Sequence, residues 1–131
     1  MITILIDHDI EGQAMLLWDS LSLYGWPDLL PLRFIRFTQV DLPINSPDRV
    51  VWRFAQENNM VLLTGNRRMR EADSLEKTLR EENNPRSLPV ITVGRVQRMV
   101  ERPYRERCLV RFLEILLELE NYRGTARIFI P

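Results

Sequence analysis

The segment Ile2-Thr3-Ile4-Leu5-Ile6-Asp7-His8-Asp9 decides the fold of this 131-residue chain. Its first five residues are almost all apolar and β-branched, a composition typical of a strand buried on both faces of a sheet. The apolar run stops at Asp7. A helical pattern then begins, with apolar residues on one face at Ile10, Ala14, Leu17, Trp18 and Leu21. A buried strand followed at once by an amphipathic helix predicts the first β-α unit of a parallel sheet.

The rest of the chain alternates strand and helix patterns in the same way. Further strands are predicted at 32–37, 60–64, 89–93 and 127–130. Arg33 and Arg36 interrupt the first of these, which an edge strand tolerates. Further helices are predicted from Ser46, from the capping-box spacing that starts at Asp73, and from Pro103 to Glu120. This order predicts one three-layer α/β/α domain over residues 1–131, with about five mostly parallel strands.

The formal net charge is zero, but the charges are unevenly distributed along the chain. Residues 1–50 contain 7 acidic and 3 basic side chains, whereas residues 86–111 contain 7 Arg and 2 acidic side chains. An acidic first part and a basic later part are compatible with a metal site that faces a polyanion. Solvated helix faces explain the same pattern equally well. The lack of excess positive charge argues against tight, non-specific nucleic-acid binding.

Cysteine and hydropathy patterns predict a cytoplasmic protein without a membrane partner. Cys108 is the sole cysteine and lies among apolar residues at helical spacing, so a buried thiol is expected. One His and one Cys exclude the usual zinc sites of His and Cys ligands. The N-terminus lacks the basic start of a signal peptide, and no apolar run approaches the roughly 20 residues of a membrane span.

The best candidate site residues follow the strands, because ligands bind in open α/β sheets beyond the carboxyl ends of the strands. Asp7 is the leading candidate, since an acid at the end of a buried strand needs a neutralising partner. A hard cation, Mg²⁺ or Mn²⁺, is one such partner. Capping of the next helix or pairing with an Arg is the alternative. If the strand continued, Asp9 would point to the other side, so it is predicted as a helix cap.

The remaining candidates have structural explanations as well as functional ones. His8, between two acids, is either a general acid or base or a solvent-facing side chain. Thr64 offers a hydroxyl at the third strand end, where Arg67 either holds phosphate or is simply solvated. Arg95 follows the fourth strand. Asp73 is a secondary candidate, for which helix capping is the favoured explanation.

Several enzyme classes lack their motifs in this chain. There is no GxSxG nucleophile motif, which argues against an α/β-hydrolase mechanism. Neither GxGxxG nor GxxxxGK[ST] occurs, so the loops that bind dinucleotides and nucleoside triphosphates are absent from the sequence.

Three short motifs together resemble the PIN-like fold of VapC-type toxins and related small proteins. They are Leu5-Ile6-Asp7 at the first strand end, Asp48 in the helix before the third strand, and the segment 61–69 that contains Thr64. The resemblance implies a metal-dependent endoribonuclease, in which acidic residues bind Mg²⁺ or Mn²⁺. It assigns the metal ligands to Asp7 and Asp48, and it implies an antitoxin-like protein as a partner.

The chain departs from the family pattern after the third strand. Two family acids fall on Asn66 and Arg68, and an amide is a weaker ligand while Arg is none. One hypothesis is therefore a ribonuclease with an incomplete acidic site, in which Asp7, Asp48 and Asn66 are catalytic. In that hypothesis Arg67, Arg68 and Arg95 bind RNA. The alternative is a catalytically inactive PIN-like module that binds RNA or a protein.

A homodimer is a third expectation. The helix predicted after Pro103 has apolar residues beyond its main face, including Ile115 and Leu119. A helix that is apolar on more than one side needs cover on more than one side. The sheet alone, or the sheet and a second copy together, would supply this cover.

Overall fold

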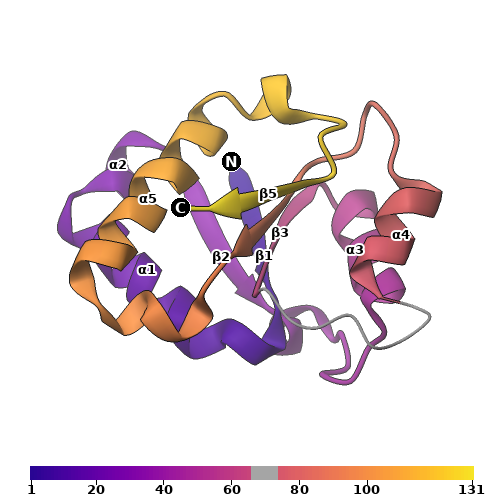
Figure 1. The fold of residues 1–131 in the computed structure, drawn as a ribbon, viewed down its shortest axis with the longest axis horizontal. Helices are drawn as coiled ribbons and strands as arrows, with labels where there is room; N and C mark the ends of the chain where they lie inside the picture. The colour runs from indigo at the N-terminus through magenta and orange to yellow at the C-terminus, as the bar shows by residue number, and fades with distance from the viewer. Residues whose placement is uncertain (66–73) are drawn as a thin grey trace.

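A parallel five-stranded sheet lies at the centre of the fold, with helices on both of its faces (Figure 1). The computed structural model describes residues 1–65 and 74–131. Within these residues the strand order is β2-β1-β3-β4-β5, and all neighbouring strands pair in parallel. The strands are β1 (Ile2–Ile6), β2 (Leu32–Arg36), β3 (Met60–Gly65), β4 (Val90–Val93) and β5 (Arg127–Ile130). The predicted parallel α/β sheet is confirmed.

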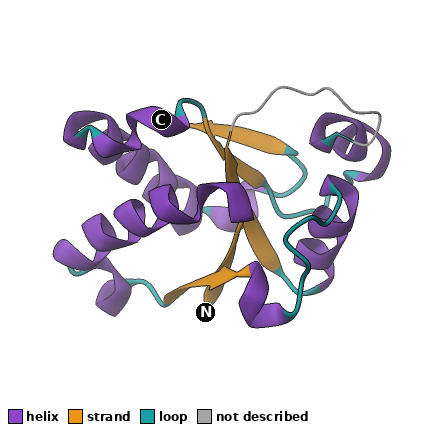
Figure 2. Cartoon of the chain, turned by 90° about the horizontal axis from the view of Figure 1, so that it is seen from below, coloured by secondary structure: helices purple, strands orange, loops and turns teal. Residues whose placement is uncertain are grey.

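The helices form the two outer layers (Figures 1 and 2). One layer contains α1 (Glu11–Leu23), α2 (Trp26–Leu29) and α5 (Arg102–Leu117). The other contains α3 (Asp48–Glu57) and α4 (Leu75–Glu82). Short 3-10 helices are η1 (His8–Ile10), η2 (Phe37–Val40), η3 (Val96–Val100) and η4 (Leu119–Tyr122). In the described ranges, no helix combines the length and the apolar character needed to cross a membrane.

The first strand is apolar throughout because both of its faces are covered. Ile4 and Ile6 pack in the core between the sheet and the layer of α1 and α5. Leu5 points the other way, into the core formed with α3 and α4. Alternation of side chains across a strand therefore sends neighbours into two separate cores. Strand β3 is buried at all six positions, as its central place requires.

Strand β2 lies at the edge of the sheet, as the sequence predicts. Arg33 and Arg36 are exposed there, while Leu32 and Ile35 are buried. Because the edge has solvent on one side, the two arginines interrupt the apolar pattern without burying a charge. The strand ends at Arg36, and Phe37 begins η2 instead of extending it.

Three predicted helix boundaries need correction. Helix α3 begins at Asp48 with Pro47 as its N-cap, because the Ser46 hydroxyl donates to the carbonyl of Pro43 and does not cap the helix. In α4 the cap is Ser74, whose side chain accepts from the backbone N–H of Lys77. Helix α5 runs over Arg102–Leu117, so it begins one residue before Pro103 and ends before Glu120.

The connection after α1 contains a short helix that the sequence pattern did not predict. Gly25 adopts a left-handed conformation with φ of 74°, which ends the preceding segment and turns the chain. Pro27 then lies in the first turn of α2, where a missing N–H costs nothing. A Gly and a Pro close together therefore mark a new helix start here as well as a stop.

Cys108 is buried in the core between α5 and the sheet, as predicted. Burial raises the pKa of its thiol to about 11, because the apolar surroundings disfavour the thiolate. The thiol is therefore an inert core side chain at neutral pH.

Candidate functional site

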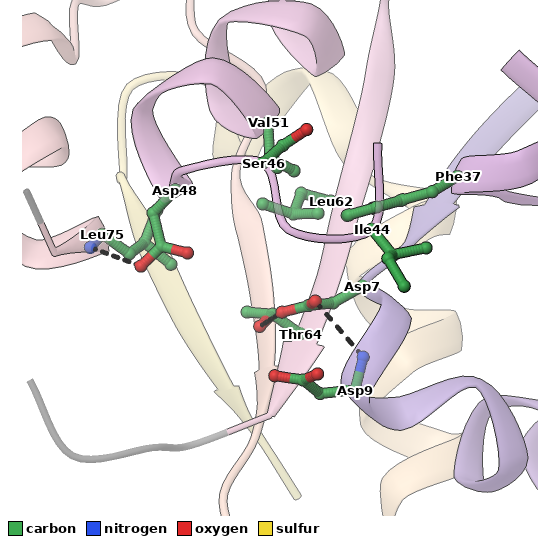
Figure 3. A pocket seen from close by; sticks show the side chains of 10 residues that line it. All are labelled: Asp7, Asp9, Phe37, Ile44, Ser46, Asp48, Val51, Leu62, Thr64 and Leu75. Atoms are coloured by element: carbon green, nitrogen blue, oxygen red, sulfur yellow. Dashed lines mark hydrogen bonds between the residues drawn. The ribbon is translucent and has the colours of Figure 1, made fainter. Parts of the chain in front are cut away.

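A pocket opens at the carboxyl edge of the sheet, beside the ends of β1 and β3 (Figure 3). After β1 the chain forms β2 on one side, and it returns to form β3 on the other side of β1. Ligands of doubly wound sheets bind at such a switch point. The cavity is small, with a volume of about 40 Å³. Its lining is Asp7, Asp9, Phe37, Ile44, Ser46, Asp48, Val51, Leu62, Thr64 and Leu75.

Two of the neighbours that hold Asp7 in place belong to the described part of the chain. The hydroxyl of Thr64 donates a 2.6 Å hydrogen bond to Asp7 Oδ2, across the boundary between β3 and β1. Asp7 Oδ1 accepts a longer hydrogen bond, 3.5 Å, from the backbone N–H of Asp9, so Asp7 is the N-cap of η1. Asp7 is only 8% exposed to solvent. The capping alternative for Asp7 is therefore realised, and the same carboxylate also lines the pocket.

Asp9 also faces the pocket, which corrects the expectation that it points away and caps a helix. Strand geometry ends at Ile6, and η1 begins at His8. Residues two apart in a strand lie on the same face, so even a continued strand would have placed Asp9 on the side of Asp7, and the expectation misapplied the alternation. The short turn of η1 keeps Asp9 on that side. The carboxyl groups of Asp7 and Asp9 consequently lie on the same side of the pocket, close to Thr64 (Figure 3).

Asp48 lies across the pocket and is turned towards α4 (Figure 3). Its Oδ2 accepts a 3.1 Å hydrogen bond from the backbone N–H of Leu75, the first residue of α4. Asp48 is also in the first turn of its own helix α3. Two helix N-termini therefore meet at this carboxylate, and both favour a negative charge. The position of Asp48 has a complete structural explanation without a ligand.

The three acids share the pocket without converging on one point. Within residues 1–65 and 74–131, no group of three or more His, Cys, Asp or Glu side chains is placed to hold a metal ion. Asp7 and Asp9 form a pair on one side, and Asp48 stands apart from them. Two carboxylates are nevertheless enough for Mg²⁺, which keeps several water ligands and is commonly held by one or two carboxylates.

Two predicted candidates, His8 and Arg95, do not line the pocket. The His8 side chain is 38% exposed, and its Nδ1 lies 3.3 Å from Oε1 of Glu11. Arg95 follows β4 and is exposed, and its backbone N–H donates to the hydroxyl of Tyr104. Neither residue is brought to the acids by the fold. Four further candidates fall outside the described residues: Asn66, Arg67, Arg68 and Asp73.

The arginine-rich stretch 86–111 does not contribute to the pocket either. Most of it lies in η3 and α5, which belong to the helix layer opposite α3 and α4 (Figures 1 and 2). Several of its side chains have local partners. Arg98 pairs with Glu101, and Arg102 pairs with Glu106. Of the two explanations for the basic stretch, the structure favours solvated and ion-paired helix faces.

The sequence analysis missed the contribution of the segment between β2 and α3. Ile44 and Ser46 come from this connection and lie at the pocket, and Phe37 supplies part of its apolar wall. The pattern around Pro43 indicates only a loop, and nothing in it shows that the loop passes over the carboxyl edge of the sheet. A clue exists in the order of elements, because a chain that leaves β2 for α3 must cross that edge.

Comparisons of the chain with protein-family models, with curated proteins and with solved structures give no significant match.

Proposed function

We propose that this protein is a metal-dependent endoribonuclease of the PIN-like kind, with Asp7 and Asp9 as its metal-binding pair. The observation that carries the proposal is the lining of one pocket by three carboxylates at the switch point of the sheet. Hard cations such as Mg²⁺ and Mn²⁺ prefer carboxylate and water oxygens, which is the donor set found here. A bound divalent cation supplies charge stabilisation and an activated water for phosphodiester hydrolysis.

The residues around the pair have separate tasks in this proposal. Thr64 holds one oxygen of Asp7, which leaves the orientation of that carboxylate fixed before a ligand arrives. The Ser46 hydroxyl donates its proton to the carbonyl of Pro43, so its oxygen is left as an acceptor on the opposite wall, suited to a water molecule. Asp48 positions the start of α4 and adds negative charge to the pocket from a distance. Asp48 thus acts as a positioning residue instead of a direct ligand.

RNA as the substrate rests on the resemblance of Asp7, Asp48 and the segment 61–69 to the PIN-like pattern. The same resemblance supports a toxin whose partner is an antitoxin-like protein. Since a phosphodiester is an anion, the acidic pocket cannot attract it without a cation, and the proposal therefore requires Mg²⁺ or Mn²⁺ for cleavage.

The test is cleavage of a labelled single-stranded RNA by the purified protein with Mn²⁺. We expect cleavage by the wild type and a loss of at least about 100-fold in rate for Asp7→Asn and Asp9→Asn, since a metal ion contributes several kcal/mol to such reactions. Asp19→Asn, an exposed site on α1, is the matched control and should cleave normally. Equal cleavage by wild type and Asp7→Asn, or none by either, would refute the proposal.

A catalytically inactive PIN-like module is the second candidate. The observation that favours it is the hydrogen bond from Leu75 to Asp48. Because Asp48 is held there, only Asp7 and Asp9 lie together on one side of the pocket. Titration calorimetry with Mn²⁺ separates the candidates. Micromolar affinity that Asp7→Ala abolishes supports the enzyme, whereas millimolar or undetectable affinity supports the inactive module, which would bind RNA or protein by another surface.

A further inference from the structure

Helix α5 exposes an apolar stripe on the face of the molecule opposite α3 and the acidic pocket. Val110 is 58% exposed and Leu117 is 55% exposed, although both are large apolar residues. The buried Leu113 lies between them in sequence. The spacings of three and four residues place all three side chains on one face of the helix. The stripe forms one wall of a groove of about 360 Å³, and Tyr24, Trp26, Glu106 and Glu114 line it as well.

Charges beside this stripe keep their spacing but exchange their signs when the order is reversed. Arg107, Arg111, Glu114 and Glu118 follow one another at spacings of four, three and four. The first three lie in α5, where this spacing places them along one flank of the stripe, and Glu118 is the C-cap residue that follows the helix. The two positive charges come first and the two negative charges last. A second copy of the helix, turned end for end, would therefore place Glu opposite Arg at each position.

The distribution of charge along α5 also opposes its own helix dipole. The first turn has no acidic residue and the last turn has no basic residue. Arg102 and Arg105 lie instead at the N-terminal end, where positive charge is unfavourable, and Glu114 lies near the C-terminal end. An antiparallel neighbour would bring its acidic end to the basic end of this helix. The unfavourable charges of the single helix would then become favourable contacts.

From these observations we infer that α5 forms a two-fold symmetric, antiparallel contact with α5 of a second copy of this chain. The apolar residues Val110, Leu113 and Leu117 form the centre, and the flank from Arg107 to Glu118 supplies the polar rim. Such a contact is self-complementary, as a two-fold interface must be. A balanced flank also fits a protein copy better than an anionic membrane surface, which would favour basic residues throughout.

Local partners of the flank do not stand against this inference. Arg111 pairs with Glu114 within the helix at 3.1 Å and also contacts Tyr122, and Arg107 lies over the ring of Tyr104. Glu118 accepts a hydrogen bond from the side chain of Asn121. Exposed pairs of this kind contribute at most about 1 kcal/mol, so they rearrange easily when a neighbouring helix arrives. The acidic pocket lies on the other side of the sheet and stays open in each copy, so the inference does not depend on the proposed function.

The first test is analytical ultracentrifugation of the full chain without metal or RNA, over a range of concentrations. We expect a dimer, and we expect Val110→Asp to raise its dissociation constant at least about 100-fold, because the two-fold axis buries two unpaired carboxylates. Val50→Asp is the matched control, since Val50 is 45% exposed on α3, in the opposite layer. A monomeric wild type, or equal loss of the dimer in both variants, overturns the inference.

The second test addresses the antiparallel orientation. Arg107→Glu and Glu118→Arg each place like charges in contact, so each should weaken the dimer by about 10-fold. The double variant exchanges the charges in both copies and should restore the wild-type dissociation constant. Circular dichroism melts check that every variant is folded. The antiparallel arrangement is contradicted if neither single variant changes the dissociation constant. It is also contradicted if the double variant dimerises more weakly than either single variant.

Discussion

The hydroxyl of Thr64 donates a 2.6 Å hydrogen bond to Oδ2 of Asp7, and this bond joins the ends of two strands that are 57 residues apart in sequence. Thr64 is 1% exposed and Asp7 is 8% exposed, so the bond lies in a region from which water is largely excluded. A hydrogen bond to a charged group is worth more than one between neutral groups. The bond therefore fixes the carboxylate at the entrance of the pocket and stabilises the sheet there.

Thr64→Val removes this hydrogen bond while keeping the shape of the side chain. We expect the free energy of unfolding to fall by about 1–3 kcal/mol, because a buried acceptor loses its donor. Urea denaturation measures the change. Thr64→Ser retains the hydroxyl and loses one methyl group, so its loss should stay near about 1 kcal/mol. If the Ser and Val variants are equally destabilised, the methyl group and not the hydrogen bond accounts for the effect.

Asp48→Ala removes the acceptor for the backbone N–H of Leu75 at the start of α4. We expect a loss of about 1 kcal/mol in the free energy of unfolding, the usual contribution of a side chain at a helix N-terminus. Asp48→Asn keeps an acceptor oxygen and should recover most of this stability. Thermal unfolding of the two variants compares them.

The same variants distinguish a positioning role of Asp48 from a ligand role. Since Asp48 stands apart from Asp7 and Asp9 and one of its oxygens accepts from Leu75, Asp48→Asn should weaken Mn²⁺ binding less than Asp7→Asn does. Calorimetric titration of both variants gives the comparison. An equal loss of affinity would show that Asp48 swings into the site and contacts the ion directly.

The strands could be predicted from the sequence, whereas the arrangement of the acids could not. The apolar run Ile2–Ile6 and the buried run before Gly65 leave little choice of structure, because only central parallel strands are apolar on both faces. The position of Asp9 depends on one local event, the start of η1 directly after Asp7. Alternation along a strand places residues 7 and 9 on the same face, so the expectation that Asp9 points away misapplied the pattern.

Long-range contacts account for the other part that the sequence did not reveal. The acid Asp48 was identified by its order in the chain, but its bond to Leu75 depends on how α3 and α4 pack. The basic stretch 86–111 was a candidate for lining the pocket because the sequence does not show on which face of the sheet its helices pack. Its assignment to the opposite layer follows from the crossover connections, which no local pattern of residues specifies.

Because Glu82 joins α4 to α3, we expect it to make the free energy of unfolding depend on pH in the acid range. Its side chain accepts hydrogen bonds from Arg53, at 2.7 Å, and from Arg49. These two bonds hold the pKa of Glu82 below its ordinary value of 4.5, with Arg53 as the larger cause. A carboxyl group whose pKa is lower in the folded than in the unfolded state stabilises the fold at pH values above its unfolded-state pKa. This stabilisation is lost as the pH falls through its folded-state pKa.

The variant Glu82→Gln isolates this effect. At neutral pH it should be less stable than the wild type, and the difference should shrink as the pH falls below 4.5, where the wild-type carboxyl group becomes protonated. The side chain of Glu82 is partly exposed to solvent, so added salt should also reduce the difference. Urea denaturation at a series of pH values measures it. A difference that does not change with pH would mean that the charge of Glu82 plays no part.

Gly65 lets η1 and η3 approach the end of β3. A Cβ atom at this position would lie 2.7 Å from Val96 Cγ2 and 2.9 Å from Ile10 Cγ2, both well inside normal contact distance. These neighbours are β-branched and cannot easily turn away. We expect Gly65→Ala to lower the free energy of unfolding by about 1–3 kcal/mol, the usual effect of overpacking.

Gly12→Ala is the control for this substitution, with the opposite sign. Gly12 lies in α1, and a Cβ there meets no atom within 4 Å, so alanine should stabilise the helix by up to about 1 kcal/mol. In Gly65→Ala the displaced Ile10 belongs to η1, which also contains Asp9. Mn²⁺ affinity should therefore fall in Gly65→Ala and stay unchanged in Gly12→Ala. If Gly65→Ala loses stability but keeps full affinity, the position of η1 does not determine the metal pair, and Asp9 is not a ligand.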